Sequence, residues 1–334
     1  MQTIRSPAVA GLFYPSAAET LAHDVRAMLA AARPPLPNPL PGIPSPQSSD
    51  GTTSHSTRLS KNDSQVAGYP ASGESEARGA EPGERERLSS IPAGEGANDS
   101  LRELRVKALI VPHAGYVYSG AVAATAYAML ARIAPRIRRV VLLGPTHRVA
   151  VRGLALPGTD AFASPLGTVE IDREAVQRIA HLPQVVVSRE AHALEHALEV
   201  QLPFLQTLLP DFKLLPLAVG MASAEEVAEV LELLWGGDET LIVISSDLSH
   251  FHPYDEAKQI DAATAQAILD LQQPLSHEQA CGGTPINGLI LAARHHHLTP
   301  HLLDLRNSGD TAGPRDQVVG YASFAFTEEV SHGH

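Results

Sequence analysis

Three apolar segments of this chain each run into a histidine, and the only cysteine of the chain follows them. The three segments end at His113, His147 and His250, and the cysteine is Cys281. In open α/β sheets the carboxyl ends of parallel strands share one rim, and ligands bind there. If the three segments are such strands, their terminal histidines lie close together.

Histidine and cysteine are side chains that bind zinc, iron and copper through imidazole nitrogen and thiolate sulfur. Each residue also has a plainer explanation, since a single histidine can be satisfied by nearby backbone and a single cysteine is often a small buried hydrophobe. Two glycines after Cys281 favour a metal ligand over a small buried hydrophobe at this position, because they allow a close backbone approach or an unusual turn. Together the four residues predict a transition-metal site at the rim of a sheet.

Asp247 stands three residues before His250, just past the third apolar segment. An aspartate in this place could cap the next helix. It could also act beside His250, because imidazole exchanges protons near neutral pH and serves as a general acid or base. Both alternatives stay open.

A rival cluster is His192-Ala-Leu-Glu195-His196, which matches the H-x-x-E-H pattern of one class of zinc hydrolase. On a helix over about 190–202, these side chains and Glu199 would share one face. Such a short pattern arises easily in a chain with 16 histidines. The alternative is that Glu195 and His196 line the same pocket as the rim histidines.

The whole-chain properties favour a soluble cytoplasmic protein. The formal charge of −12 disfavours a nucleic-acid partner, and one cysteine cannot form an internal disulfide. Of the 334 residues 44% are hydrophobic, which suits a globular core. We find neither a signal peptide at the start nor an uncharged apolar run near the roughly 18 residues of a membrane helix.

The composition divides the chain into one domain and an insertion. Residues 34–102 are rich in Pro, Ser, Gly and Glu, which predicts a disordered insertion. Strand and helix patterns alternate elsewhere, so residues 1–33 and 103–330 are predicted to form one α/β domain, with a flexible tail at 331–334. We expect three layers, with a central mostly parallel or mixed sheet between helices. Capping boxes are expected at Ser16 and Ser223.

Several stretches, in this order, resemble the MEMO family, whose prokaryotic members are called AmmeMemoRadiSam system protein B. They run from residue 5 to about 326 and omit only the insertion. The matching stretches include residues 5–15, 112–120, 144–147, 195–199, 245–250, 281–283, 307–310 and 319–322.

The resemblance implies a fold similar to that of class III extradiol ring-cleaving dioxygenases, which hold iron with two histidines and a carboxylate. In the MEMO family the equivalent pocket has two histidines and a cysteine, matched here by His113, His147 and Cys281. His250 matches the acid/base histidine of the dioxygenases, with Asp247 beside it. We also expect further side chains to line the same pocket around the ligands: Tyr116, Glu195 and His196.

The expected cofactor is one transition-metal ion, iron or copper, with zinc as a further possibility. Cysteine in place of carboxylate matters, because a softer thiolate favours Cu(I), zinc or a differently tuned iron. Ring cleavage therefore does not follow from the fold, since function depends on the site. The chain is expected to be a metal-dependent oxidoreductase or a non-catalytic binding module. The resemblance implies a radical SAM protein and an AmmeMemo-type protein as partners.

Overall fold

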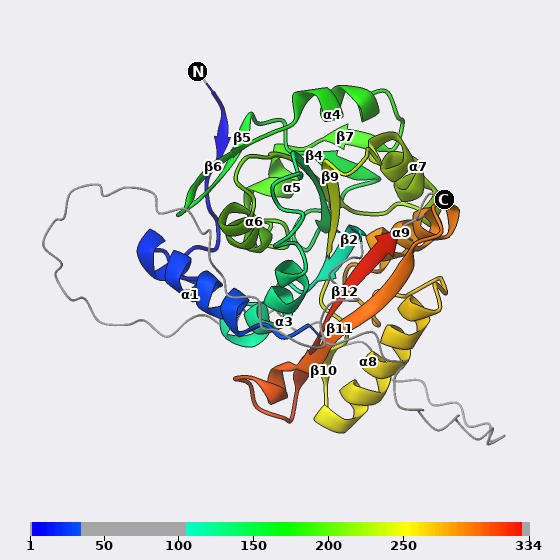
Figure 1. Cartoon of the computed structure of the whole chain (residues 1–334). Helices are drawn as coiled ribbons and strands as arrows, with labels where there is room; N and C mark the ends of the chain where they lie inside the picture. The colour runs from blue at the N-terminus through cyan, green and yellow to red at the C-terminus, as the bar shows by residue number, and fades with distance from the viewer. Residues whose placement is uncertain (1, 35–104, 329–334) are drawn as a thin grey trace, which may run out of the picture.

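The computed structural model describes residues 2–34 and 105–328 (Figure 1). The predicted insertion at 34–102, beyond its first residue, and the predicted tail at 331–334 lie outside the described residues. No helix in the described ranges combines the length and apolarity needed to cross a membrane.

Strands and helices alternate along the chain. The strands are β1 (Ile4–Arg5), β2 (Arg105–Val111), β3 (Arg139–Pro145), β4 (Leu154–Leu156), β5 (Ala161–Ser164), β6 (Gly167–Glu170), β7 (Val185–Val187), β8 (Lys213–Val219), β9 (Thr240–Ser245), β10 (His250–His252), β11 (Thr299–Asn307) and β12 (Val318–Glu328). The α-helices are α1 (Ala18–Ala31), α3 (Tyr116–Ala128), α4 (Arg173–Ile179), α5 (Arg189–Ala193), α6 (Leu202–Leu208), α7 (Ala224–Leu234), α8 (Tyr254–Leu269) and α9 (Gly283–His295). Two short 3₁₀ turns are η1 (Glu199–Gln201) and η2 (Ser308–Asp310).

The central sheet is mixed. Its strand order is β10-β12-β2-β9-β3-β8-β4-β7, and β11 pairs with β12. The four middle strands β2, β9, β3 and β8 run parallel, whereas β12 is antiparallel to β2 and β4 is antiparallel to β8. The parallel middle places the carboxyl ends of β2, β9 and β3 side by side.

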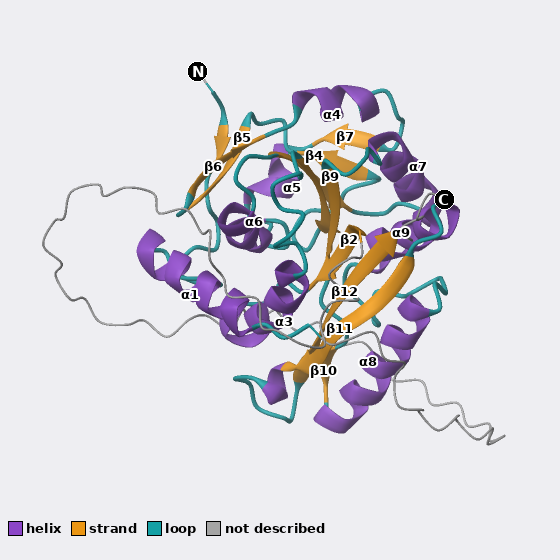
Figure 2. Ribbon diagram, viewed as in Figure 1, coloured by secondary structure: helices purple, strands orange, loops and turns teal. Residues whose placement is uncertain are grey.

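Helices cover both faces of this sheet (Figure 2). Alternate residues of the central strands point to opposite faces, as the pleat requires. Leu109 of β2 packs in a core with α1, α3 and α6, and the next residue, Ile110, packs in a second core with α4, α7, α8 and α9. The structure therefore confirms the predicted three-layer α/β architecture.

The predicted helix over 190–202 is wrong. Helix α5 ends at Ala193, and the chain becomes helical again only at Glu199. The side chain of Arg5 donates to the carbonyl oxygens of His192 (2.9 Å) and Glu195 (2.6 Å). Those oxygens would accept the next bonds of a continuous helix, so a contact from a distant segment breaks it.

The two expected capping boxes differ in outcome. At Ser223 the hydroxyl accepts from the backbone of Glu226, and the Glu226 carboxylate accepts from the backbone of Ser223, which confirms the box. At Ser16 the prediction is wrong, because the N-cap of α1 is one residue later, at Ala17, whose methyl side chain makes no capping hydrogen bond.

Candidate metal centre

His113 and His147 lie at the carboxyl ends of two parallel strands. His113 follows β2 by two residues and His147 follows β3 by two residues, with β9 between those strands. Their ring centroids are 5.2 Å apart. The rim arrangement expected from the sequence thus brings the two imidazoles together.

His196 joins them from the loop after α5. Its ring stacks on His147 with centroids 4.7 Å apart and meets the edge of His113 at 5.4 Å. The ligand atoms of the three histidines all lie within 4.8 Å of one another, so the group could hold a metal ion. The sequence placed His196 in the pocket wall, whereas the structure gives it the position of a donor.

The outer nitrogen of each ring faces a polar partner. Nδ1 of His113 lies 2.9 Å from the Ser245 hydroxyl, and Nδ1 of His147 lies 2.9 Å from Oε1 of Glu195. Nδ1 of His196 lies 3.4 Å from the same carboxylate oxygen. Partners of this kind fix the tautomer and orientation of metal-binding histidines, and they leave each Nε2 for an ion.

Glu195 is the shared partner of the His147 and His196 rings. It is buried, with only 2% of its surface exposed. Burial raises the pKa of its carboxyl group, but the hydrogen bonds from His147 and the charge of His147 outweigh burial and bring the pKa to about 2. The carboxylate also accepts from the backbone N–H groups of His147 (2.6 Å) and Ala197 (2.9 Å). It is therefore an ionised group that fixes the loop and the rings together.

The buried histidines favour the neutral form. Burial, followed by the charge of neighbouring His113, lowers the pKa of His196 to about 3. Burial also lowers the pKa of His113 well below its ordinary value, with the charge of His147 adding to the effect. Neutral imidazoles have the free lone pair that a metal ligand needs.

Cys281 lies beside His113 but outside the three-histidine group. Its Sγ is 3.3 Å from Nε2 of His113. With usual metal–nitrogen and metal–sulfur bonds of about 2.1 and 2.3 Å, this separation gives an angle of roughly 100° at a shared ion. Burial, with the charge of Asp247 second, raises the pKa of the thiol.

Gly282 lets Cys281 approach the rim. Its backbone N–H donates to the Ser246 hydroxyl at 2.9 Å, and a Cβ at this position would lie 2.6 Å from the Ser246 Cβ. A side chain would therefore push Cys281 away from β9. The close approach expected from the glycine pair is present.

Asp247 is buried and contacts His113. Its Oδ1 accepts from the His113 backbone N–H at 2.7 Å, and its Oδ2 lies 3.9 Å from Nε2 of the same residue. It does not cap the next helix, because α8 starts after Pro253 without a side-chain cap. Burial raises the pKa of Asp247, against the charge of His250, which begins β10 at the same rim.

Tyr116 supports the site from the core. Its hydroxyl donates to the carbonyl oxygen of Val200 at 2.6 Å, and its ring packs against Phe204 at 5.1 Å between centroids. It is 6% exposed. These contacts hold the segment after His196 against α3.

The H-x-x-E-H hypothesis fails because its two histidines point to different places. His192 is buried, and its Nε2 lies 2.8 Å from the carbonyl oxygen of Ala155. His196 instead joins His113 and His147. The broken helix removes the shared face on which that hypothesis rested.

An ion pair between Arg5 and Glu199 is the feature that the sequence reasoning missed. Both side chains are buried, and Glu199 also accepts from the backbone N–H groups of Ala8 (2.7 Å) and Val9 (3.0 Å). Through the carbonyl bond to Glu195 described above, Arg5 ties the N-terminal segment to the loop that carries Glu195 and His196. The sequence signal that could have revealed this ion pair was the family-matching stretch over residues 5–15, which begins at Arg5.

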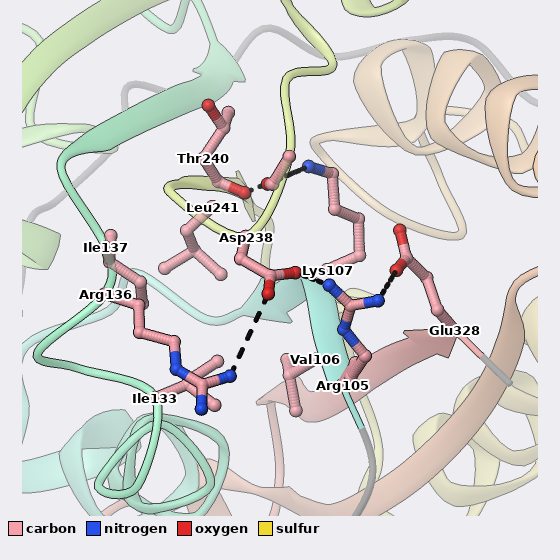
Figure 3. A pocket seen from close by; sticks show the side chains of 11 residues that line it. Arg105, Val106, Lys107, Ile133, Arg136, Ile137, Asp238, Thr240, Leu241 and Glu328 are labelled. Carbon is pink, nitrogen blue, oxygen red and sulfur yellow. Dashed lines mark hydrogen bonds and ion pairs between the residues drawn. The ribbon is translucent and has the colours of Figure 1, made fainter. Parts of the chain in front are cut away.

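A separate hollow lies at the other end of the same strands (Figure 3). It borders the starts of β2 and β9, so it is far from the histidine rim. Arg105 pairs with Asp238 and with Glu328, and Arg136 lies 3.8 Å from Asp238. Its arginines are therefore paired with carboxylates, Lys107 donates to backbone carbonyl oxygens, and the hollow contains none of the predicted site residues.

The fold and the histidine group define an α/β protein with a candidate transition-metal centre at the rim of a mixed sheet. The family described as Memo-like protein matches residues 87–325. The chain belongs to this family.

Two MEMO1 family relatives agree with the family match. A MEMO1 family protein from Methanosarcina barkeri is 37% identical over 240 residues, which cover 67% of this chain and 87% of the relative. One from Aquifex aeolicus is 35% identical over 257 residues, covering 73% and 95%. A solved structure of an uncharacterised protein from Escherichia coli K12 overlaps with a TM-score of 0.44 at 16% identity, covering 66% of this chain and 99% of that one.

Proposed function

We propose that this chain binds one transition-metal ion, iron or copper, and uses it in an oxidation–reduction step. His113, His147 and Cys281 are the proposed ligands, and His196 is a fourth donor on the same ion. The observation that carries the proposal is the convergence of three imidazoles whose outer nitrogens all face polar partners. Metal-binding histidines typically have a polar partner of this kind on the ring nitrogen that does not bind the ion, so these contacts favour a metal site.

The donor set fits a redox ion. Neutral imidazoles and one thiolate are ligands that suit iron, copper and zinc, and a thiolate is soft enough to hold Cu(I). The thiol of Cys281 would lose its proton on binding, because a coordinating sulfur is deprotonated by the ion. When bound, the ion would supply electron transfer at this position.

The protein's own residues would orient and move protons around the site. Asp247 fixes the backbone of His113, so it acts as a positioning residue there. His250 stands at the start of β10, partly exposed, where it can exchange protons with solvent and with a bound molecule. We propose His250 as the proton carrier.

The test is metal analysis of protein purified without a tag from native cells. We expect about one iron or copper ion per chain. A His113→Ala, Cys281→Ser double variant should lose that ion while its thermal unfolding stays cooperative. Retention of the full metal content in the double variant would overturn the assignment.

A second candidate function is a non-catalytic binding module. Two exposed apolar side chains each adjoin a site residue in sequence: Leu194 precedes Glu195, and Phe251 follows His250. Exposed apolar groups near a pocket favour a partner or ligand with an apolar surface. Under this alternative the partner is a radical SAM protein or an AmmeMemo-type protein, and its co-purification would survive loss of the metal ligands.

A further inference from the structure

A second cluster of metal-binding side chains lies on the far end of α9, away from the rim. It consists of Glu232 from α7 and His295 and His296 from the end of α9. Their ligand atoms also lie within 4.8 Å of one another. Helix α9 has 13 residues and starts next to Cys281, so the two clusters are separated by about 20 Å of helix.

The glutamate faces both imidazoles at once. Its Oε1 lies 3.3 Å from Nδ1 of His295, and its Oε2 lies 2.8 Å from Nε2 of His296. The two rings stack with centroids 4.9 Å apart. Two imidazole nitrogens and a carboxylate directed at one another are the three protein ligands of many zinc sites.

The packing of the two helices holds one of the ligands rigidly. His296 stacks flat on Trp235, with centroids 3.8 Å apart and planes 8° apart. Trp235 caps the C-terminal end of α7, and His296 caps the C-terminal end of α9. Figure 1 shows these helices side by side.

The two helix ends also favour a cation. The C-terminal end of a helix carries a partial negative charge, and here two such ends converge beside a carboxylate. The exposed fractions of the side chains are 71% for His295, 27% for His296 and 33% for Glu232, so an ion could enter from solvent. Water could fill the remaining coordination positions.

We propose that Glu232, His295 and His296 form a second site for a divalent first-row transition-metal ion of the zinc class. The bound ion links the ends of α7 and α9. This site is independent of the redox ion proposed at the rim, and its failure would leave that proposal untouched.

The chain contains a built-in reporter for this site. Trp235 is its only tryptophan, and it lies against a proposed ligand. Cu(II) is the strongest-binding ion of the divalent series and serves as the probe. Titration of Cu(II) should quench Trp235 fluorescence in a saturable way, and Zn(II) should compete.

Variants decide the outcome. His295→Ala removes an exposed ligand and Glu232→Gln a half-buried one, and each should weaken the affinity measured by Cu(II) quenching by at least about tenfold. The matched control is His297→Ala, which removes an exposed histidine of the same run that is outside the cluster. The titration is repeated in the His113→Ala, Cys281→Ser background, where the quenching should persist.

Three results would overturn the proposal. The first is quenching unchanged in both ligand variants. The second is equal weakening in His297→Ala, which would indicate an adventitious ion on a histidine-rich surface. The third is quenching lost in the rim double variant, which would place the bound copper at the rim. As a second readout, Zn(II) should raise the melting temperature of the wild type more than that of Glu232→Gln, because an ion that binds only the native state stabilises it.

Discussion

The Sγ atom of Cys281 lies 3.3 Å from Nε2 of His113, although 168 residues separate them in the chain. One residue follows the end of a strand, and the other precedes the start of a helix. A single ion between them would cross-link the segment after β2 to the segment before α9. This contact makes the thiolate the most specific spectroscopic probe of the rim site.

Replacement of Cys281 by serine should remove a sulfur signature without removing all metal affinity. In the Co(II)-loaded wild type we expect a sulfur-to-metal charge-transfer absorption band, because a coordinating thiolate donates charge to the ion. The band should vanish in Cys281→Ser and persist in His196→Ala. His277→Ala is the control, since this exposed residue is hydrogen-bonded to the Cys281 carbonyl oxygen and lies near the Thr284 hydroxyl. A band that survives in Cys281→Ser would show that the thiolate is not a ligand.

Replacement of Glu195 by glutamine should lower the metal affinity of the rim site, although Glu195 is not a metal ligand in our proposal. An amide cannot serve as the ionised acceptor for both His147 and His196, so the rings lose their orientation. Loss of such a supporting partner typically lowers metal affinity by about 10- to 100-fold. Competition with a chelator would measure the change. Glu190→Gln, an exposed carboxylate on α5, should have no effect, and an equal effect there would contradict the role of Glu195.

Loss of Arg5 should destabilise the fold far more than loss of a surface arginine. Arg5→Met leaves the Glu199 carboxylate buried without its cation, which typically costs about 3–5 kcal/mol. Arg173→Met removes an exposed ion pair with Asp160 and should cost about 0–1 kcal/mol. Denaturant unfolding measures both. Equal losses in the two variants would mean that burial of the Arg5 pair has little effect on stability.

The strand framework could be predicted from the sequence because its signals are local and strong. The middle strands are buried on both faces, so they appear as continuous apolar runs such as residues 241–244. Their parallel order then brings His113 and His147 to one rim. The positions of these two histidines could therefore be predicted from the place where each strand ends.

The loop of Glu195 and His196 could not be predicted in the same way. Its pattern fits a helix, and long-range bonds from Arg5 to the carbonyls of His192 and Glu195 compete with that helix. Helical spacing would put His192 and His196 together, whereas the broken helix sends His196 to the rim and His192 to Ala155. A contact across 187 residues leaves no trace in local periodicity.

Asp261 should make stability depend on pH. This residue of α8 is 2% exposed, and its Oδ1 accepts from the Ser249 backbone at 3.0 Å, next to β10. Burial raises the pKa of its carboxyl group from 3.8 to about 6, although the bonds from Ser249 oppose the rise. The folded protein therefore keeps a proton between about pH 4 and 6 that the unfolded chain has released.

The sign of the effect follows from this difference in bound protons. Because the native state binds more protons in that window, the contribution of Asp261 to the free energy of unfolding falls as the pH rises from about 4 to 6, by about 3 kcal/mol. Asp261→Asn has no proton to lose and retains an oxygen for Ser249. Its stability relative to the wild type should thus increase across the window and stay constant above it. Denaturant unfolding at several pH values would measure the difference, with Asp255→Asn, an exposed aspartate of the same helix, as the control. A stability difference between Asp261→Asn and the wild type that does not change with pH would show that the buried carboxyl group is already ionised at pH 4.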